Sequence, residues 1–457
     1  MASVFSRVSL WLGGLVVGVT AFAGEWVAGP MLGYRAHREV AIWAETRNAA
    51  TVTVHFHPVD RPSDARTLTM TTPAATPVGV QPMLFRLPLL EMGTRYTYWF
   101  EVDGQTIERP YPLTFETMNQ WEYRTPPPDF TFLFGTCAYQ NDAPYDRPGE
   151  PYGKGTGIFR HMAGSGADFM IWGGDNVYLR EADFSSASGI WYRYSRDRAN
   201  EDLQPLLAGM HHYAVWDDHD FGPNDSNRTF EFKDVSLQAF QTYWANPTWG
   251  EPDNPGVYGK FTWGDAIFLL LDDRYHRDES TLNEEGAEEK SVWGRQQFTW
   301  LKQSLLHAKR QRHYAWKFIV TGGQFVQTED TSHRIETHEL YRRERDELIE
   351  FIRENMITGV VFLTGDVHHS ALYRRSITDT QALYEVTSSP ISSGADTRGA
   401  EVKLRDPALV AGTYVATQNY CRLSLRGAPD ARELLVQCFD SANTLRWERV
   451  VRLAELQ

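Results

Sequence analysis

Apolar residues in the N-terminal part of the chain recur at every second position. Residues 25–125 contain short runs of this kind, separated by clusters of Pro, Asp and Gly; the clearest are 40–44, 51–57 and 95–102. A period of two is typical of strands with one buried face, so we expect a small β-sandwich over 25–125. The sequence Thr125-Pro126-Pro127-Pro128 follows it as a stiff linker.

From residue 129 onward the pattern changes to short apolar runs that alternate with longer stretches of helical periodicity. The runs predict buried strands at 130–134, 169–172, 212–216, 267–271, 316–320 and 360–363. Stretches such as 295–307 and 339–354 predict helices. Strands alternating with helices indicate an α/β domain over 129–457. The acidic stretch 283–289 reads as a surface loop, placed to cover a site.

Polar residues follow most of these predicted strands at the point where each one ends. In open α/β sheets the ligand site lies beyond the carboxyl ends of the strands, so these side chains are expected to converge there. The candidates are Cys137, Asp175, Tyr178, Asp217, Asp218, His219, Asn224, Arg274, Asp366, His368 and His369. The pair His211-His212 lies at the start of a strand instead, and we expect it at the surface.

Convergence of several carboxylates favours a metal centre. Carboxylates held close together repel one another unless a multivalent cation binds them or some stay protonated. Asp175 could bridge two cations, and such sites clamp a phosphoryl group and generate a hydroxide nucleophile. One alternative is a metal-free esterase in which Cys137 and His219 act as a thiol pair, although the nearby carboxylates disfavour a thiolate. Another is a secreted binding protein whose metal centre is only structural.

Composition and charge narrow the class of protein. The chain has 457 residues, is 42% hydrophobic and carries a formal charge of −14, which suits two globular domains and does not favour nucleic acid as a partner, except as a substrate. Arg7, an apolar run at 8–19 and Ala21-Phe22-Ala23 predict a signal peptide over 1–23. We therefore expect export to a periplasmic or extracellular location, with an uncleaved N-terminal anchor as the alternative. After residue 24 no stretch is apolar enough to span a membrane.

Two of the three cysteines fall in a predicted hairpin. The runs 420–426 and 433–440 alternate like strands, and a hairpin centred on 427–432 places Cys421 opposite Cys438. In an oxidising compartment the two could form a disulfide, and otherwise they are neighbouring buried thiols; the sequence leaves both readings open.

Four motifs, in order along the chain, resemble the successive motifs of the PhoD-like alkaline phosphatases, a branch of the calcineurin-like metallophosphoesterases. They are Gly135-Thr136-Cys137, Gly174-Asp175-Asn176-Val177-Tyr178, Trp216-Asp217-Asp218-His219-Asp220 and Gly365-Asp366-Val367-His368-His369. Residues 385–390 fit the same family. In the N-terminal part, the sequence of residues 90–98 resembles a turn and strand of fibronectin type III domains, with Met92 where that family usually has Pro.

The resemblance implies a four-layer α/β/β/α catalytic domain that holds ferric iron, Fe(3+), and calcium, Ca(2+); a zinc or manganese pair is the alternative. It implies that Cys137, Asp175 and Tyr178 are iron ligands, that Asp366 and His368 also contribute, and that Asn224 meets calcium and the substrate phosphate. Thiolate and phenolate suit Fe(3+), and carboxylate and amide oxygens suit Ca(2+). Two features depart from the family: no twin-arginine signal is present, and position 176 is Asn.

Several residues keep two interpretations. His219 is a general acid for the leaving oxygen or a support for Asp218. Asp217 and Asp218 are ligands or groups behind the ligands, and His369 is a support for the centre or a packing residue. Arg274 clamps a phosphate oxygen or pairs with Asp272.

The function that we expect is hydrolysis of phosphate monoesters or diesters by a metal-bound hydroxide. Its substrate would be a small phosphate ester, a phospholipid or a cell-surface phosphopolymer; the sequence does not indicate an oligomeric state.

Overall fold

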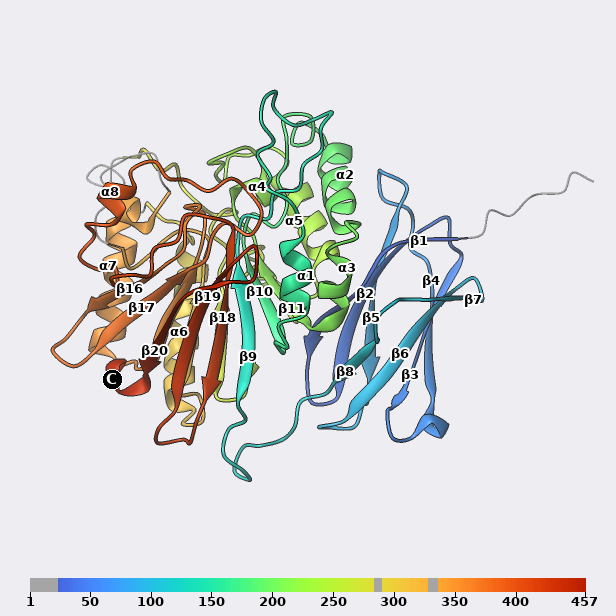
Figure 1. Ribbon diagram of the computed structural model, residues 1–457, viewed down its shortest axis with the longest axis horizontal. Helices are drawn as coiled ribbons and strands as arrows, with labels where there is room; N and C mark the ends of the chain where they lie inside the picture. The colour runs from blue at the N-terminus through green and yellow to red at the C-terminus, as the bar shows by residue number, and fades with distance from the viewer. Residues whose placement is uncertain (1–23, 283–289, 328–335) are drawn as a thin grey trace, which may run out of the picture.

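The largest sheet of the computed structural model has nine strands and joins both ends of the chain (Figure 1). The structure describes residues 24–282, 290–327 and 336–457. The strand order is β20-β19-β18-β9-β10-β11-β1-β2-β5, and β9, β10 and β11 run parallel. In that order the strands span Leu445–Arg452, Glu433–Asp440, Asn419–Arg426, Phe130–Gly135, Phe169–Gly173, His211–Val215, Glu25–Arg35, Glu39–Arg47 and Gln81–Pro88.

A second sheet of six strands carries the other half of the α/β part. Its order is β12-β13-β14-β15-β17-β16, with β13, β14, β15 and β17 parallel. These strands span Gly259–Trp263, Ala266–Leu270, Trp316–Val320, Val360–Thr364, Ala382–Thr387 and Ala371–Ser376. The six strands predicted from residue 129 onward are all present, three in each sheet (β9, β10 and β11; β13, β14 and β15), and each lies within one residue of its expected bounds.

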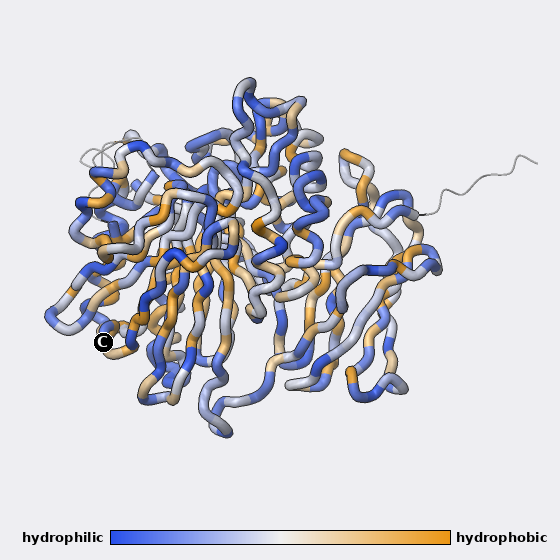
Figure 2. Tube along the Cα trace, in the orientation of Figure 1, coloured by the Kyte–Doolittle hydropathy of each residue, from blue (hydrophilic) through white to orange (hydrophobic). Residues whose placement is uncertain are grey.

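The two sheets share one apolar core. Phe132 of β9 packs edge-on against Phe268 of β13 and Phe318 of β14, with ring centroids 5.3 and 5.4 Å apart. Tyr213 of β11 stacks on Phe261 of β12 at 3.6 Å. Burial of so many large rings is strongly favourable and fixes how the sheets face each other. Figure 2 shows hydrophobic residues concentrated along these strands.

Helices supply further apolar side chains on each side. Those that precede the second sheet are α1 (Ile158–Ala163), α2 (Ala187–Arg198), α3 (Gln204–Gly209), α4 (Asp218–Phe221) and α5 (Lys233–Tyr243). All five lie in the part of the chain between β9 and β12, which also forms several of the loops at the site. Helices α6 (Arg295–Arg310) and α7 (Arg342–Glu354) share a second core with β13, β14 and β15. The remaining short helices are η1 (Pro62–Asp64), η2 (His338–Tyr341), α8 (Ala400–Lys403) and η3 (Leu453–Glu455). The predicted loop at 283–289 lies outside the described residues.

The N-terminal region is a sandwich whose two sheets have different neighbours. Its outer sheet has the order β4-β3-β6-β7, with β8 paired to β6; these strands span Arg66–Thr71, Thr51–Pro58, Arg95–Val102, Gln105–Ile107 and Thr114–Glu116. Its inner strands β1, β2 and β5 belong to the nine-stranded sheet, where Leu32 of β1 pairs with His211 of β11. The inner strands of the sandwich are therefore continuous with the nine-stranded sheet, which the linker at 125–128 had not suggested.

Two expectations about single residues are settled by the strands. Cys421 of β18 pairs with Cys438 of β19, which confirms the predicted register, and both thiols are buried and free. His211 and His212 are buried in β11, contrary to the expectation of a surface position, because β1 and helix α3 cover this strand. None of the described helices has the length and apolar character needed to span a membrane.

Candidate metal centre

The loops that follow parallel strands of both sheets are tied to one another by backbone hydrogen bonds. The amide of Cys137 donates to Gly174 O at 3.2 Å, and the amide of Gly365 donates to Gly322 O at 2.7 Å. The two sheets approach each other closely where Gly365, after β15, meets Thr136, after β9. Glycine is required at position 365, since a Cβ there would lie 2.2 Å from the side chain of Thr136. The carboxyl ends of the two sheets thus meet, as the positions of the motifs predicted.

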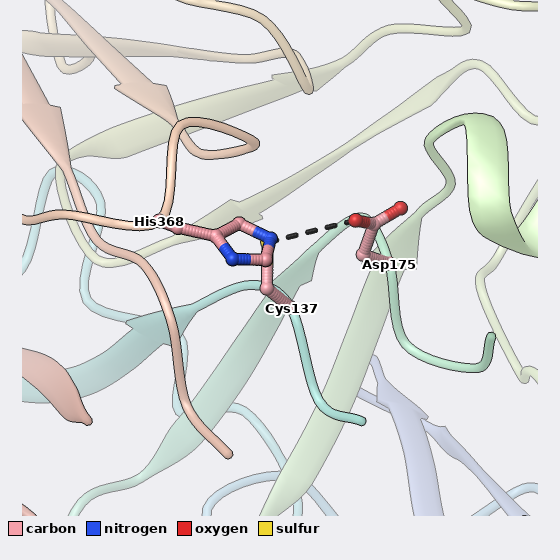
Figure 3. A group of neighbouring side chains, drawn as sticks. All are labelled: Cys137, Asp175 and His368. Carbon is pink, nitrogen blue, oxygen red and sulfur yellow. Dashed lines mark hydrogen bonds between the residues drawn. The ribbon is translucent and has the colours of Figure 1, made fainter. Parts of the chain in front are cut away.

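A first group of ligating side chains comes from three of these loops. One donor atom each from Cys137, Asp175 and His368 lie within 4.8 Å of one another. Figure 3 shows the three side chains converging, and Cys137 Sγ lies 3.6 Å from Asp175 Oδ2. The phenol of Tyr178 is 3.3 Å from Nε2 of His368 and extends the group.

A second group shares Asp175 with the first. Donor atoms of Asp175, Asp218 and His219 again lie within 4.8 Å of one another. Oδ1 of Asp218 and Nδ1 of His219 are buried and have no hydrogen-bond partner among the described residues. Burying such atoms unpaired is costly, so these two orphaned atoms fit a bound cation. Asp175 is placed to serve both groups.

The backbone at the centre adopts an uncommon conformation. Four candidate ligands, Cys137, Asp175, Asp366 and His368, have φ angles of 61°, 54°, 66° and 54°. The left-handed region is unfavourable for residues with a Cβ and is usually retained where function needs it. Here it turns each side chain back toward the shared space beyond the strand ends.

Without a cation, the surroundings of the candidate ligands disfavour their charged forms. Burial, with the charges of Asp218 and Asp217, raises the pKa of Asp175 well above its ordinary value. Burial and the charge of Asp175 likewise raise the pKa of the Cys137 thiol and of the Tyr178 phenol. A multivalent cation would reverse these shifts by favouring the charged forms. The donor set of thiol, phenol, imidazole and carboxylate therefore fits a metal centre.

His219 and Asp218 affect each other's pKa. Burial lowers the pKa of His219, although the charge of Asp218 opposes the shift. Burial opposes ionisation of Asp218, but His219 and Arg274 nevertheless hold its pKa below the usual range. A neutral His219 can ligate a cation or donate one hydrogen bond.

Arg274 does not pair with Asp272 as one interpretation of the sequence proposed. Its Nε lies 2.6 Å from Asp217 Oδ1, and its Nη1 lies 2.5 Å from Glu336 Oε2 and 3.2 Å from the carbonyl of Ser226. Only its backbone amide donates to Asp272, at 3.0 Å. Asp217 in turn caps helix α4, accepting from the amide of Asp218 at 3.0 Å, so it lies behind Asp218 and His219.

The remaining predicted residues, Asp366, Asn224 and His369, lie in three different environments. Asp366 lines the same cavity of about 610 Å³ as Asp175, Asp218 and His368 but belongs to none of the ligating groups found among the described residues. Asn224 is exposed at the rim of this cavity. His369 is buried and does not line this cavity; its Nε2 lies 3.1 Å from the hydroxyl of Tyr373.

Sequence reasoning missed three residues at the site. Tyr152 places its hydroxyl 3.0 Å from Nδ1 of His368. Asp225 and Glu336 form a third acidic group with Asp218. None of the three follows a predicted strand; only Asp225 carried a hint, since it is next to Asn224.

The family model of the PhoD-like phosphatases matches residues 145–431. The chain belongs to this family. A second family model, a domain of unknown function (DUF7800), matches residues 23–119, which include the N-terminal sandwich.

Relatives of this PhoD-like phosphatase agree with the assignment. Alkaline phosphatase D of Bacillus subtilis (strain 168) is 24% identical over an alignment of 321 residues; the match covers 59% of this chain and 53% of that protein. The match thus spans about half the length of that relative.

Solved structures share the fold of this PhoD-like phosphatase. A structure of PhoD superposes with a TM-score of 0.77 at 17% identity, covering 93% of this chain and 90% of that one. The purple acid phosphatase PPD1 of yellow lupin (Lupinus luteus) seeds gives a TM-score of 0.64 at 12% identity, covering 93% and 74%. At these identities the likeness is one of fold.

Proposed function

We propose that the chain is a metal-dependent hydrolase of phosphate monoesters or diesters, of the alkaline phosphatase D type. The observation that carries the proposal is the position of Asp175, whose carboxylate belongs to two adjacent ligating groups at the meeting point of the two sheets. A carboxylate so placed can bridge two cations, and paired cations are suited to phosphoryl transfer. Family membership supports the same reaction class.

The proposed ligands divide by their chemistry. Cys137, Tyr178 and His368 would hold Fe(3+), with Asp175 shared, because anionic sulfur and phenolate oxygen suit a ferric ion. Asp366 and Asn224 would hold Ca(2+), together with Asp218. When bound, the cations supply Lewis acidity and a nucleophile derived from water near neutral pH.

The protein groups around the ligands fix their orientation. Nδ1 of His368 lies 2.5 Å from the carbonyl oxygen of Gly394, so Nδ1–H donates there and Nε2 is left to ligate. Ser389 donates to Cys137 Sγ at 3.1 Å. Asn224 and His219 lie at the rim, where an amide and an imidazole N–H can donate to phosphoryl and leaving oxygens as charge develops on them.

The remaining features of the proposal concern cell location and fold. We propose that residues 1–23 direct export to the periplasm or the extracellular space, where a small phosphate ester, a phospholipid or a cell-surface phosphopolymer would be the substrate. Helices packed outside each of two facing sheets support a four-layer α/β/β/α domain. The outer sheet, with the order β4-β3-β6-β7 and β8 paired to β6, supports a fibronectin type III kind of sandwich.

The test is release of p-nitrophenol from bis-p-nitrophenyl phosphate and from p-nitrophenyl phosphate, with calcium and with a chelator. We expect release that the chelator abolishes and that added metal restores. The ratio of the two rates decides between diesterase and monoesterase. Protein that contains its metals and releases nothing from either ester would contradict the proposal.

A further inference from the structure

A second cavity adjoins the one that holds the ligating groups. It has a volume of about 330 Å³ and shares Tyr152, Tyr178, His219 and Asn224 with the metal centre or its rim. Beyond this junction it is walled by Tyr139 and continues to the exposed Arg147. We call it the aromatic cavity. Its volume is within the range of small-molecule sites and is enough for one or two rings.

The walls of the aromatic cavity are the rings of three tyrosines. Tyr139 lies 5.0 Å from Tyr152 and 4.9 Å from Tyr178 between ring centroids. Tyr178 continues the wall to His219, at 4.3 Å. Rings arranged in this way offer faces and edges to another planar ring, a favourable contact beyond simple burial.

The charges beside these rings are already paired. Arg180 lies 3.0 Å from Asp146 and stacks 4.0 Å over the ring of Tyr139, and Arg147 lies 2.8 Å from Glu181. The aromatic cavity therefore has no unpaired cationic group, among the described residues that line it, to attract a phosphoryl group. The acidic cavity beside it, where the proposed cations would bind, is the place for the phosphoryl group.

We propose, resting on the phosphoesterase function above, that the aromatic cavity binds the leaving alcohol of the ester and selects alcohols that carry a planar ring. In the hydrolysis, an oxygen of water bonds to phosphorus, the bond between phosphorus and the ester oxygen breaks, and that oxygen leaves as the alcohol with a proton from the water. In an in-line displacement the leaving oxygen lies opposite the attacking oxygen, so it would point away from the cations that hold the attacking water. The only junction of the two cavities lined by described residues is at Tyr152, His219 and Asn224, so the ring beyond that oxygen enters the aromatic cavity.

Tyr152 is the residue on which the test depends. Its side chain is 44% exposed, so replacing it leaves the core intact. Its hydroxyl contacts His368 and its ring faces Tyr139, and the two contacts can be separated. Tyr152→Phe removes only the hydroxyl, whereas Tyr152→Leu also removes the ring.

The experiment compares two phosphate monoesters, one aryl and one fluoroalkyl, whose leaving alcohols are matched in acidity. In a monoester the leaving alcohol is the only organic group, so a preference reports on that group alone. The metal-loaded, full-length protein should show a higher kcat/KM for the aryl ester. Tyr152→Leu should reduce this preference by about tenfold, the value of one stacking contact, and Tyr152→Phe should keep it. Equal losses on both esters in Tyr152→Leu would overturn the proposal, leaving Tyr152 only as a support of His368.

A binding measurement separates this proposal from the phosphoesterase function. Equilibrium dialysis of p-nitrophenol against the same metal-loaded proteins requires no turnover. We expect binding to the wild type and to Tyr152→Phe, and about tenfold weaker binding to Tyr152→Leu. Equal binding by all three, or none by the wild type, would refute the aromatic subsite, whether or not either ester is hydrolysed.

Discussion

Arg274 holds Asp217 in a buried ion pair, with Nε 2.6 Å from Oδ1 and both side chains 1% exposed. Glu336 occupies another side of the same guanidinium. Arg274 is thus a positioning residue for the loop that carries Asp218 and His219. This pairing differs from the role of a phosphate clamp, and the two roles predict different mutants.

Replacing Arg274 should destabilise the fold. In Arg274→Met, Asp217 stays buried without its ion-pair partner and Glu336 keeps only Arg277, which should reduce the free energy of unfolding by about 3–5 kcal/mol. Denaturant unfolding of the metal-loaded protein measures this loss. The double variant Arg274→Met/Asp217→Asn should recover part of it, since one buried charge is removed. Normal stability with a raised KM would show instead that Arg274 binds the phosphate.

Asp175→Asn should remove activity and metal together. An amide is a weaker ligand than a carboxylate and cannot bridge two cations, so we expect turnover to fall by more than about 100-fold and bound metal to fall with it. Metal analysis and the p-nitrophenol assay give the two readings. Asp379→Asn, at an exposed turn far from the centre, is the matched control and should change neither. A fully active, metal-loaded Asp175→Asn would exclude the bridging role.

Tyr178→Phe should remove the phenolate contribution to the visible absorption of a ferric centre. Fe(3+) bound by phenolate is coloured, and the phenol of Tyr178 is the one beside His368 Nε2. Tyr139→Phe serves as the control, because its hydroxyl donates to Asp146 at 2.7 Å and not to the ligating group. A visible spectrum unchanged in Tyr178→Phe, with iron still bound, would mean that the phenolate assignment is wrong.

Stability should depend on pH through Glu344 of α7. Burial raises the pKa of Glu344 from 4.5 to about 7, although it accepts hydrogen bonds from Ser291 and Val292. Between these pH values the folded state holds a proton that the unfolded chain releases, so the stability present below pH 4.5 falls as the pH rises to about 7. The loss from this group is about 3 kcal/mol.

Glu344→Gln is the control for this pH dependence, since an amide does not titrate. Unfolding free energies measured below pH 4.5 and above pH 7 should differ less in this variant than in the wild type. An identical difference in both proteins would rule out Glu344 as the source.

Removing the N-terminal sandwich should prevent the catalytic part from folding. Glu45 of β2 is fully buried and accepts from Ser195 of α2 at 3.1 Å, and Trp43 donates to the carbonyl of Thr242 at 2.8 Å. A chain of residues 129–457 would lose these partners and expose an edge of β11, which favours aggregation. We expect this fragment to be insoluble and a chain of residues 24–457 to be soluble; solubility and circular dichroism measure both. A soluble, active fragment 129–457 would show that the sandwich is dispensable.

The sequence by itself determined the strands and the chemistry at their ends. Each of the six apolar runs from 130 to 363 became a strand because local periodicity and burial agree there. Parallel strands present their carboxyl ends at one edge, so Cys137, Asp175 and His368 were predicted to meet and do so. The register of Cys421 with Cys438 followed from hairpin symmetry alone.

Only the tertiary structure decided which residues from outside the strand ends join the site. Tyr152 and Glu336 come from segments with no periodic pattern, and their positions depend on how long loops pack against finished sheets. His211 is buried rather than exposed because a strand nearly 180 residues earlier, β1, pairs beside it. Sequence periodicity reports the environment of a single element, whereas pairing between distant segments is fixed by the energy of the whole assembled fold.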